Sequence, residues 1–505
     1  MTGLADRHAG VLDGRLDQLG ARTAIVALNI EPGTAGTAAV QHTAWMLVNL
    51  LARLADVVSA VLVIGDDATL LPRITPLAHC ANSLRSALLQ GGNSIGGVPV
   101  RLADGTKPDY ELHVGPGPDR AGLRVYGEGY CGAVSRGAIA PVGTSSLPFG
   151  PYIAACLAVG EIFRATRLRP DLYEPVTALS FSAWDYTLGS GQLDQADPSL
   201  DALVLDFGLA GVGAVGCALL HALWACPQLS GQAVIADSDP EGVDHTNLNR
   251  CVIFGQQDIG KAKATTAAAI LADAGIAWQP VDGRYARSMI PRVPATLVSA
   301  VDTNGSRDHL QQAFWPARLL ASSTKDLRAE ILRCGPPGDG RCLSCFNPPE
   351  VDLPDDVRRA HLRAFPPGDL EAFAAEIGHP VSMVRRWAEE GGCGSVGDAA
   401  LARMREDDEP PAMFSVGFAS VMAGTLLAVE LIKEHLGTPV PLDDEHQNVK
   451  FQFWRPTASR NGRPTTVQRD WNCRACDPAG AGAEVWRRRW QTHGASRTRS
   501  TPQTR

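Results

Sequence analysis

A glycine motif and an aspartate, separated by an apolar run, are the residues of this sequence best arranged for chemistry. Gly211, Gly213 and Gly216 lie where a buried strand would turn into a helix. Glycines at such a turn let the backbone approach a phosphate at a helix N-terminus, which favours anions. Asp237 ends the next apolar run, where an acid can bind a ribose. The pattern predicts a mononucleotide or dinucleotide site.

A second set of polar residues indicates chemistry at the phosphate as well as binding. Arg250 follows Asp237 within ADSDPEGVDHTNLNR, and Lys261 and Lys263 come shortly after it. Cations beside a phosphate neutralise the charge that builds up when an anionic nucleophile attacks it. Asp302 ends a third apolar run, where a carboxylate could hold magnesium. An NAD oxidoreductase would leave Arg250 and Asp302 without a role, whereas Lys261 could equally be a surface charge.

The cysteines form two kinds of candidate site. Two CxxC pairs could give four thiolates to one tetrahedral zinc ion, and such a site would be structural because no ligand position stays open; its members are Cys342, Cys345, Cys473 and Cys476. Cys393 stands alone in GGCGSVGD, where flanking glycines would let a partner chain come close. Cys393 is therefore either a nucleophile or an ordinary loop thiol, with Cys334 as the alternative nucleophile.

Strands that alternate with helices must position these residues. The expected strands are 200–210, 231–237 and 295–302, and the expected helices between them are 211–226 and 261–275. This alternation predicts an α/β fold with a doubly wound, Rossmann-like parallel sheet. A long, mostly buried helix is expected over residues 414–437.

The first half of the chain resembles the second in its pattern. Its helix segment AACLAVGEIFR is similar to AGTLLAVELIK near the end of the chain, which suggests a duplicated α/β domain. The first half shows no glycine fingerprint and no acid placed after a strand for a ribose. We therefore expect a tandem: residues 1–195 form an inactive domain and residues 200–480 an active one, which a polar insertion (346–412) interrupts. Residues 481–505 are expected to be a basic tail without fixed structure, or an anion-contacting arm.

Composition excludes several functional classes. The chain has 505 residues, of which 45% are hydrophobic and 20% charged, and its net charge is −8. A soluble globular protein fits these values, and a nucleic-acid binder does not. No secretory signal or membrane span is expected, so a cytoplasmic location is the default. Twelve cysteines in that setting indicate metal sites or reactive thiols in place of disulfides.

The ordered motifs GVGAVG, ADSDPEGVDHTNLNR, GKAK and AVDTNGSR resemble the adenylyltransferase family of ubiquitin-activating enzymes. That family includes the bacterial activators of sulfur-carrier proteins, the ThiF/MoeB type. The motifs span residues 205–310, and weaker similarity continues to about residue 480. The family usually has glutamine after the arginine and often asparagine after the magnesium aspartate. Cys251 and Thr303 occupy those places here, which puts the details of adenine and phosphate geometry in doubt.

The resemblance implies roles for individual residues. The three glycines would line the phosphates of ATP, and Asp237 would bind the ribose. Asn247 and Arg250 would contact and orient the phosphate. Lys263 would neutralise the α- to γ-phosphates, and Asp302 would carry Mg²⁺. Asp239 either supports the magnesium site or holds the turn before the following proline. The two CxxC pairs would meet at one Zn²⁺.

The function implied is activation of a small ubiquitin-like protein that has a free C-terminal tail. Its carboxylate would be adenylated by ATP and then passed as a thioester to Cys393, the cysteine between the first CxxC and the closing helix. A conjugating enzyme would be the next partner, and a bacterial conjugation pathway, such as those of antiphage defence, would fit. Neither nucleic acid nor membrane is an expected partner. The alternatives are a sulfur-carrier or small-molecule adenylyltransferase without thioester transfer, and a non-catalytic nucleotide-binding scaffold.

Overall fold

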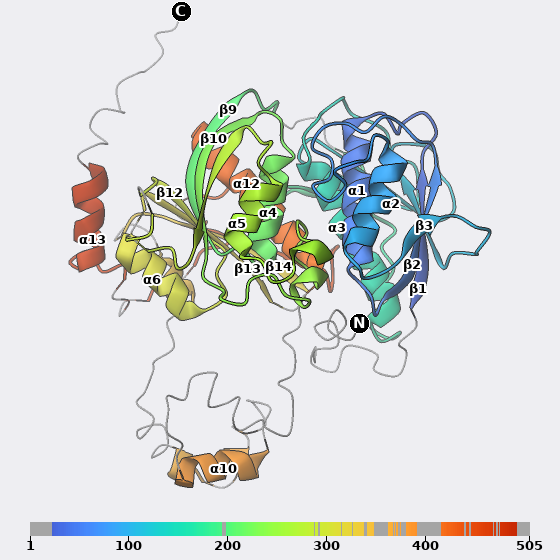
Figure 1. The fold of residues 1–505 in the computed structure, drawn as a ribbon. Coiled ribbons are helices and arrows are strands. Elements are labelled where there is room, and N and C mark those ends of the chain that lie inside the picture. The colour runs from blue at the N-terminus through green and yellow to red at the C-terminus, as the bar shows by residue number, and fades with distance from the viewer. Residues whose placement is uncertain are drawn as a thin grey trace, which may run out of the picture. The chain divides into compact units, whose positions relative to one another are not determined.

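Two β-sheets, one from each half of the chain, organise the computed structural model (Figure 1). The structure describes residues 23–193, 198–347 and 416–491, with short gaps in the last two ranges, together with parts of 362–390. None of the described helices is long and apolar enough to cross a membrane.

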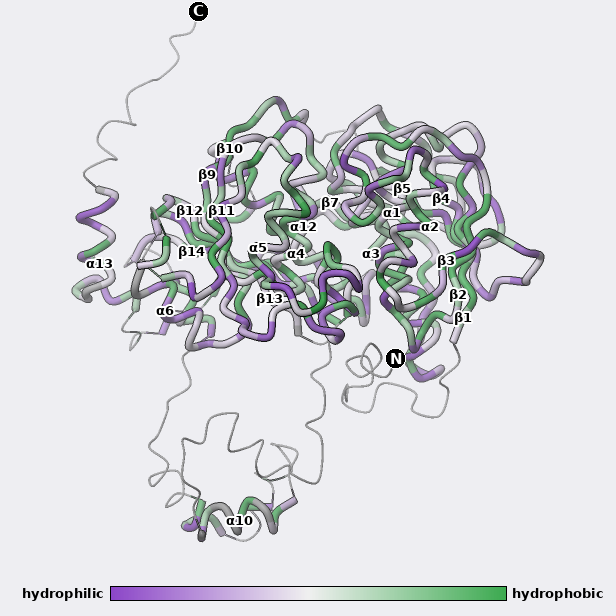
Figure 2. Tube along the Cα trace, viewed as in Figure 1, coloured by the Kyte–Doolittle hydropathy of each residue, from purple (hydrophilic) through white to green (hydrophobic). Residues whose placement is uncertain are grey.

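The first sheet has the strand order β3-β2-β1-β4-β5-β6-β7-β8. Its strands are β1 (Ala24–Ile30), β2 (Val58–Gly65), β3 (Val100–Leu102), β4 (Tyr110–Val114), β5 (Leu123–Glu128), β6 (Cys131–Ser135), β7 (Ala178–Ser182) and β8 (Leu188–Gly189). Its helices are α1 (Ala38–Ala52), α2 (Leu84–Ser94) and α3 (Phe149–Arg167). Hydrophobic residues follow one another along β1 and β2 (Figure 2), as expected for strands covered on both faces.

The second sheet has the order β11-β10-β9-β12-β13-β14-β15. Its strands are β9 (Leu203–Ala210), β10 (Leu229–Asp237), β11 (Ile276–Asp282), β12 (Thr296–Ser299), β13 (Arg318–Lys325), β14 (Arg328–Cys334) and β15 (Asn448–Gln452). Its main helices are α4 (Ala214–Trp224), α5 (Lys263–Ile270), α6 (Asn304–Phe314) and α12 (Gly417–Leu436). The expected strands and helices are present, but β11 was not expected, because IAWQPVD lies at the sheet edge and lacks a continuous apolar run.

The two sheets share one topology, which confirms the expected tandem of α/β folds. In each, the first five strands of the order are parallel, and the next two join antiparallel. In each, one long helix lies between the two antiparallel strands along the chain: α3 in the first half and α12 in the second. The similarity between AACLAVGEIFR and AGTLLAVELIK therefore marks equivalent helices.

These equivalent helices carry the same buried ion pair. In α3, Arg164 donates to Glu161 at 2.6 Å, and in α12, Lys433 donates to Glu430 at 2.5 Å. A tyrosine hydroxyl donates to the glutamate in both cases. A buried charge requires such partners, so the Glu-x-x-Arg/Lys pattern is retained because both helices are buried.

The two halves are joined through one continuous hydrophobic core. Helix α3 packs on α1 and on α12, and α12 packs on α4. Tyr186 of the first half donates to Glu430 of α12 at 2.5 Å, and Phe163 of α3 packs against Phe418 of α12. Helix α12 is buried over nearly its whole circumference, which explains why its sequence is apolar on every face.

Two segments outside the sheets complete the description. Residues 349–412 form a separate compact unit, in which α10 (Val381–Glu390) was expected as a helix and Cys393 lies outside the described residues. The start of the basic tail is helical, over α13 (Ala481–Trp486) and the π-helix Arg487–Gln491. The expectation of a tail without structure is therefore wrong for these residues. The reason is tertiary, because Trp486 packs against the cysteine cluster.

Candidate active site

Three parallel strands end at one level and gather the predicted residues at one edge of the second sheet. Ala210, at the end of β9, pairs with Ala236 of β10 on one side and with Ser299 of β12 on the other. Gly211 and Asp237 follow directly, and Asp302 follows three residues after Ser299. The chain leaves β9 towards β10 on one side, whereas β12 lies on the other. Such a switch point is where open α/β sheets bind ligands.

Close contacts explain two of the three glycines of the motif. Gly211 has a φ of +96°, and a Cβ there would lie 2.7 Å from the carbonyl oxygen of Ala300. A Cβ on Gly216 would lie 2.1 Å from the carbonyl oxygen of Gly211, so α4 could not approach the loop. Gly213, just before α4, has nothing within 4 Å of a Cβ. Gly211 and Gly216 therefore shape the turn, whereas the space beside Gly213 is open at the helix N-terminus, where an anion is favoured.

The carboxylate of Asp237 is bound to the glycine loop itself. It accepts hydrogen bonds from the backbone N–H groups of Val212 at 2.6 Å and Asp239 at 3.0 Å. The acid after β10 is thereby held beside the start of α4. A ribose hydroxyl could use the remaining acceptor capacity of this carboxylate.

Asp239 and Lys263 form an ion pair next to Asp237. Asp239 also accepts from the backbone N–H of Glu241 at 3.0 Å, so it holds the turn around Pro240. Burial opposes the charge of Lys263, but the hydrogen bond to Asp239 and the charge of Asp237 outweigh it and raise the pKa of Lys263. Lys263 is therefore a firmly charged ammonium group at the start of α5. Asp239 was expected either to support the magnesium site or to hold this turn. In the structure it holds the turn, and it also pairs with Lys263.

The predicted Asn247 and Arg250 lie in one compact loop. Asn247 starts a short 3-10 helix (Asn247–Asn249) and exchanges backbone-to-side-chain hydrogen bonds with Asp244 at 2.8 and 3.3 Å. The Arg250 guanidinium donates to the carbonyl oxygen of Thr246 at 2.7 Å and to Oδ1 of Asn249 at 2.8 Å. These bonds fix the guanidinium within the loop and leave other N–H groups of its fork for a ligand.

Cys251 and Cys217 show that this loop meets the glycine helix. Cys217, which follows Gly216, is fully buried beside Cys251. The Cys217 thiol, and then the charges of Arg250 and Lys263, lower the pKa of Cys251. Arg250 and Lys263 therefore both lie near this buried thiol. The cysteine found where the family has glutamine lies beside Cys217 on the helix that follows the glycine loop.

Asp302 and Lys261 lie at the margin of this arrangement. Asp302 is exposed between β12 and α6. Burial lowers the pKa of Arg307, and the negative charge of Asp302 counteracts that shift. Arg307 therefore lies close enough to Asp302 to feel its charge. Lys261 is exposed and pairs with Asp258 at 3.2 Å. Lys261 is therefore a surface charge, which was one of the two possibilities raised by the sequence.

The two CxxC pairs come together in one cluster that could bind a metal ion. The four sulfur atoms of Cys342, Cys345, Cys473 and Cys476 lie within 4.8 Å of one another. Three of the separations are 3.4, 3.5 and 3.7 Å, close to the ~3.8 Å expected for tetrahedral Zn–S bonds of about 2.3 Å. This donor set can bind one zinc ion and leaves no position for a substrate.

The structure weakens the alternative nucleophile. Cys334 is buried in β14, and burial raises the pKa of its thiol to about 12. A thiolate is the reactive form, so Cys334 is a poor nucleophile where it lies. Cys156 and Cys226 are also fully buried core residues, as expected.

The equivalent edge of the first half was read incompletely from the sequence. Asp66 directly follows β2 and accepts from the backbone N–H of Gly33 at 2.8 Å, just as Asp237 accepts from Val212. The expectation that the first half has no acid after a strand is therefore wrong. At the place of Gly211, however, the first half has Glu31, whose buried carboxylate pairs with Arg124 at 3.2 Å. The sequence signal for Asp66 was the GDDA that ends an apolar run.

Sequence reasoning also missed polar residues on α1. Asn49 and Arg53 are fully buried, and both donate hydrogen bonds to the loop that contains Arg250. Their sequence signal was present: two polar residues four positions apart in the otherwise apolar stretch AWMLVNLLARLA.

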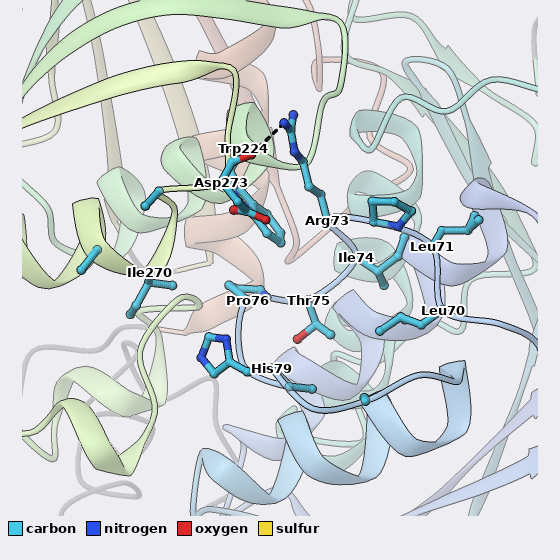
Figure 3. A pocket seen from close by; sticks show the side chains of 15 residues that line it. Leu70, Leu71, Arg73, Ile74, Thr75, Pro76, His79, Trp224, Ile270 and Asp273 are labelled. Atoms are coloured by element: carbon cyan, nitrogen blue, oxygen red, sulfur yellow. Dashed lines mark hydrogen bonds between the residues drawn. The ribbon is translucent and has the colours of Figure 1, made fainter.

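A separate cavity of about 540 Å³ lies between residues 70–81 of the first half and residues 224 and 269–273 of the second. Figure 3 shows Arg73 reaching Asp273, to whose carbonyl oxygen it donates at 2.8 Å. None of the predicted site residues lines this cavity.

The fold and this edge define a class of protein: a tandem α/β protein in which, among the described residues, only the second half has a nucleotide-type glycine loop. The model of the ThiF family matches residues 203–475, and the chain belongs to this family. Membership fits ATP-dependent adenylation in general terms.

One relative and two solved structures of a second protein are similar to this chain. The chain is 23% identical over 514 residues to the uncharacterized protein y4jF of Sinorhizobium fredii (strain NBRC 101917 / NGR234), which covers 94% of this chain and 92% of that protein. The structure of E. coli MccB with AMPCPP and MccA is 15% identical with a TM-score of 0.35, and covers 55% of this chain and 68% of that one. E. coli MccB with ATP is 14% identical with a TM-score of 0.33, and covers 55% and 67%.

Proposed function

We propose that the second half adenylates the C-terminal carboxylate of a small ubiquitin-like protein. The observation that carries the proposal is that two cations lie near the glycine loop: Lys263 pairs with Asp239 next to Asp237, and Arg250 precedes Cys251, which lies beside Cys217 of α4. An NAD site needs the glycine loop and the acid but not two cations close to them. Chemistry at a phosphate does need them.

Each residue has a task in the proposed reaction. The loop of Gly211 and Gly213 admits the phosphates, and Asp237 binds the ribose. A carboxylate oxygen of the partner attacks the α-phosphorus, the bond to the bridging oxygen breaks, and pyrophosphate leaves. Arg250, with Asn247 beside it, stabilises the charge at the α-phosphate, and Lys263 neutralises the departing phosphates. Much of the rate enhancement comes from holding both reactants together.

Two metals fit the residues present. Asp302 offers an exposed carboxylate oxygen, the donor that Mg²⁺ prefers, and Mg²⁺ there would neutralise phosphate charge. The four cysteines would hold Zn²⁺ as a structural ion that ties the segment before residue 346 to the segment after residue 472. The residues already present supply the type of ligand atom that each metal prefers.

The proposed second step is transfer of the acyl group to Cys393. The thiolate attacks the acyl carbon, a thioester bond forms and AMP leaves; a conjugating enzyme would then take the acyl group. The support is the position of Cys393 in a glycine-rich stretch of the insertion and the burial of Cys334. The alternative is adenylation of a sulfur carrier or small molecule without a thioester.

The adenylation step is tested by ATP–pyrophosphate exchange in the presence of a ubiquitin-like protein with a free Gly-Gly tail. Asp302→Ala should reduce exchange by at least ~100-fold, whereas Lys261→Ala should not change it, because Lys261 is a surface charge. Equal exchange in wild type and Asp302→Ala would refute the magnesium assignment.

The thioester step is tested by a partner adduct that reducing agent releases. Cys393→Ala should abolish the adduct and leave pyrophosphate exchange intact. An adduct that survives this change would assign the nucleophile elsewhere. Exchange without any adduct in the wild type would favour the alternative without thioester transfer.

A further inference from the structure

Helix α1 of the first half directs a stripe of polar groups at the second half. Trp45, Asn49 and Arg53 lie on one face of the helix, because their spacing of four places them one turn apart. The Trp45 indole donates to Nε2 of His221 on α4 at 3.2 Å. All three side chains are fully buried. Their partners belong to α4 and to the loop that contains Arg250, so this face of α1 binds the active half.

Asn49 and Arg53 bind the main chain of that loop at three points. Arg53 donates to the carbonyl oxygen of Leu248 at 2.6 Å and to that of Phe254 at 3.0 Å. The Asn49 amide donates to the carbonyl oxygen of Val252 at 2.9 Å. Arg250 lies between the first two of these points along the chain. We refer to Asn49 and Arg53 together as the α1 clamp.

The clamp is itself rigid. Nε of Arg53 donates to Oδ1 of Asn49 at 2.7 Å. This bond directs the Asn49 amide nitrogen towards Val252. Because the guanidinium is planar, its three hydrogen bonds fix the relative positions of Asn49, Leu248 and Phe254.

The backbone of Arg250 is enclosed from a second side. A Cβ on Gly417, the first residue of α12, would lie 3.2 Å from the side chain of Leu50 on α1 and 3.7 Å from Cα of Arg250. The closing helix, α1 and Arg250 therefore meet at this glycine. Hydrogen bonds within its own loop hold the guanidinium of Arg250. The main chain of Arg250 is instead positioned by the first half and by α12.

The chemistry of Arg53 exceeds what packing alone requires. Among the residues that the structure describes, no carboxylate pairs with it, and its acceptors are neutral carbonyl and amide oxygens. Burial lowers the pKa of Arg53 to about 10, so the group stays charged at neutral pH. An apolar side chain would join two halves without burying a charge. The cation instead lies close enough to act on Cys251, beside Arg250 and Lys263.

We propose that Asn49 and Arg53 of the first half are positioning residues for phosphate chemistry in the second half. They hold the loop that presents Arg250, and Arg53 adds positive charge behind the site. This inference rests on the proposed adenylation. It gives the first half a task although Glu31 stands in place of the loop glycine: the first half supports the loop that contains Arg250.

The test compares Arg53→Met with Tyr186→Phe in the full-length protein. Arg53→Met keeps the side-chain length but removes the charge and three hydrogen bonds. Tyr186→Phe removes one buried hydrogen bond between the same two halves, to Glu430, and does not touch the loop. Arg53→Met should raise the KM for ATP in pyrophosphate exchange and lower kcat, each by about 10-fold, whereas Tyr186→Phe should change neither. Arg53→Lys, which keeps the charge, should give a KM for ATP between those of the wild type and Arg53→Met.

Hydrogen exchange of the nucleotide-free protein separates this inference from the proposed function. Amides 248–254 should exchange faster in Arg53→Met and as in wild type in Tyr186→Phe. If the wild type neither binds ATP nor exchanges pyrophosphate, the proposed function fails while the positioning remains measurable. Unchanged loop exchange and unchanged KM in Arg53→Met, or equal losses in Tyr186→Phe, would overturn the inference. If Arg53→Met does not fold, Asn49→Ala, which deletes one loop bond, should give the same pattern at about 3-fold.

Discussion

The two halves of this chain share a strand order and differ at the loop after their first strand. Both have an aspartate after the second strand whose carboxylate accepts a loop N–H, Asp66 in one and Asp237 in the other. The second half has Gly211 at the loop, whereas the first has Glu31 paired with Arg124. An anion repels phosphates. The aspartate therefore belongs to the shared architecture, and the glycines and cations distinguish the proposed nucleotide site of the second half from the equivalent edge of the first half.

The largest expected effect comes from adding one methyl group to each loop. Gly211→Ala would place a Cβ 2.7 Å from a backbone oxygen at a φ of +96°, whereas Gly33, with a φ of +74°, has nothing within 4 Å. We expect Gly211→Ala to weaken ATP binding by at least ~100-fold, because the loop must move. Gly33→Ala should lower the free energy of unfolding by only about 1 kcal/mol and leave binding unchanged. Calorimetry with ATP measures both; similar losses would mean that both loops bind nucleotide.

Acid should destabilise the core between the halves next most strongly. Burial lowers the pKa of His42 and of His221 to about 3, and His221 must stay neutral to accept the Trp45 N–H. The unfolded chain binds these protons near pH 6.5, so stability is full above that pH and falls below it. At pH 5 each histidine should reduce the free energy of unfolding by about 2 kcal/mol. Denaturant unfolding at pH 7.5 and 5 measures this, and His42→Gln should remove roughly half of the difference. Equal stability at both pH values would contradict the burial of neutral histidines.

Removing Glu31 from the equivalent edge of the first half should affect stability and not ATP binding. Glu31→Ala leaves the buried guanidinium of Arg124 without its carboxylate, which should lower the free energy of unfolding by about 3 kcal/mol. The KM for ATP should stay within about 2-fold, since Glu31 lies in the first half. Thermal unfolding and pyrophosphate exchange check the two parts. A large gain in nucleotide binding would show that Glu31 alone closes the first site.

The smallest expected effects sharpen the role of the paired aspartates. Asp237→Asn should weaken ATP binding by about 10-fold, because a ribose hydroxyl loses a charged acceptor. Asp66→Asn should leave ATP binding unchanged and cost about 1 kcal/mol of stability at most, since Asp66 is exposed. Titration with a fluorescent ATP analogue distinguishes the two. Equal weakening would mean that the first half contributes directly to nucleotide binding.

The local features of the site were predictable from the amino-acid sequence. A tight turn into a helix requires Gly211 and Gly216, and strand ends place Asp237 and Asp302 at one edge. CxxC spacing limits Cys342 and Cys345 to one metal. Each of these constraints acts over a few residues or over one parallel-sheet repeat, so it is visible as spacing. The role of Cys393 remains a prediction, because it lies outside the described residues.

Only the tertiary structure decided how the halves cooperate. The contacts of Asn49 and Arg53 with Leu248 and Val252 join residues about two hundred positions apart, and no local period encodes such a pairing. The same holds for the helical start of the tail, which packs against cysteines far away in sequence. The sequence by itself determined that one half carries a nucleotide-type loop and four zinc-type thiols. Folding determined that the other half, with Glu31 at the equivalent loop, lies against that site, because a shared buried core brings α1 to the loop of Arg250.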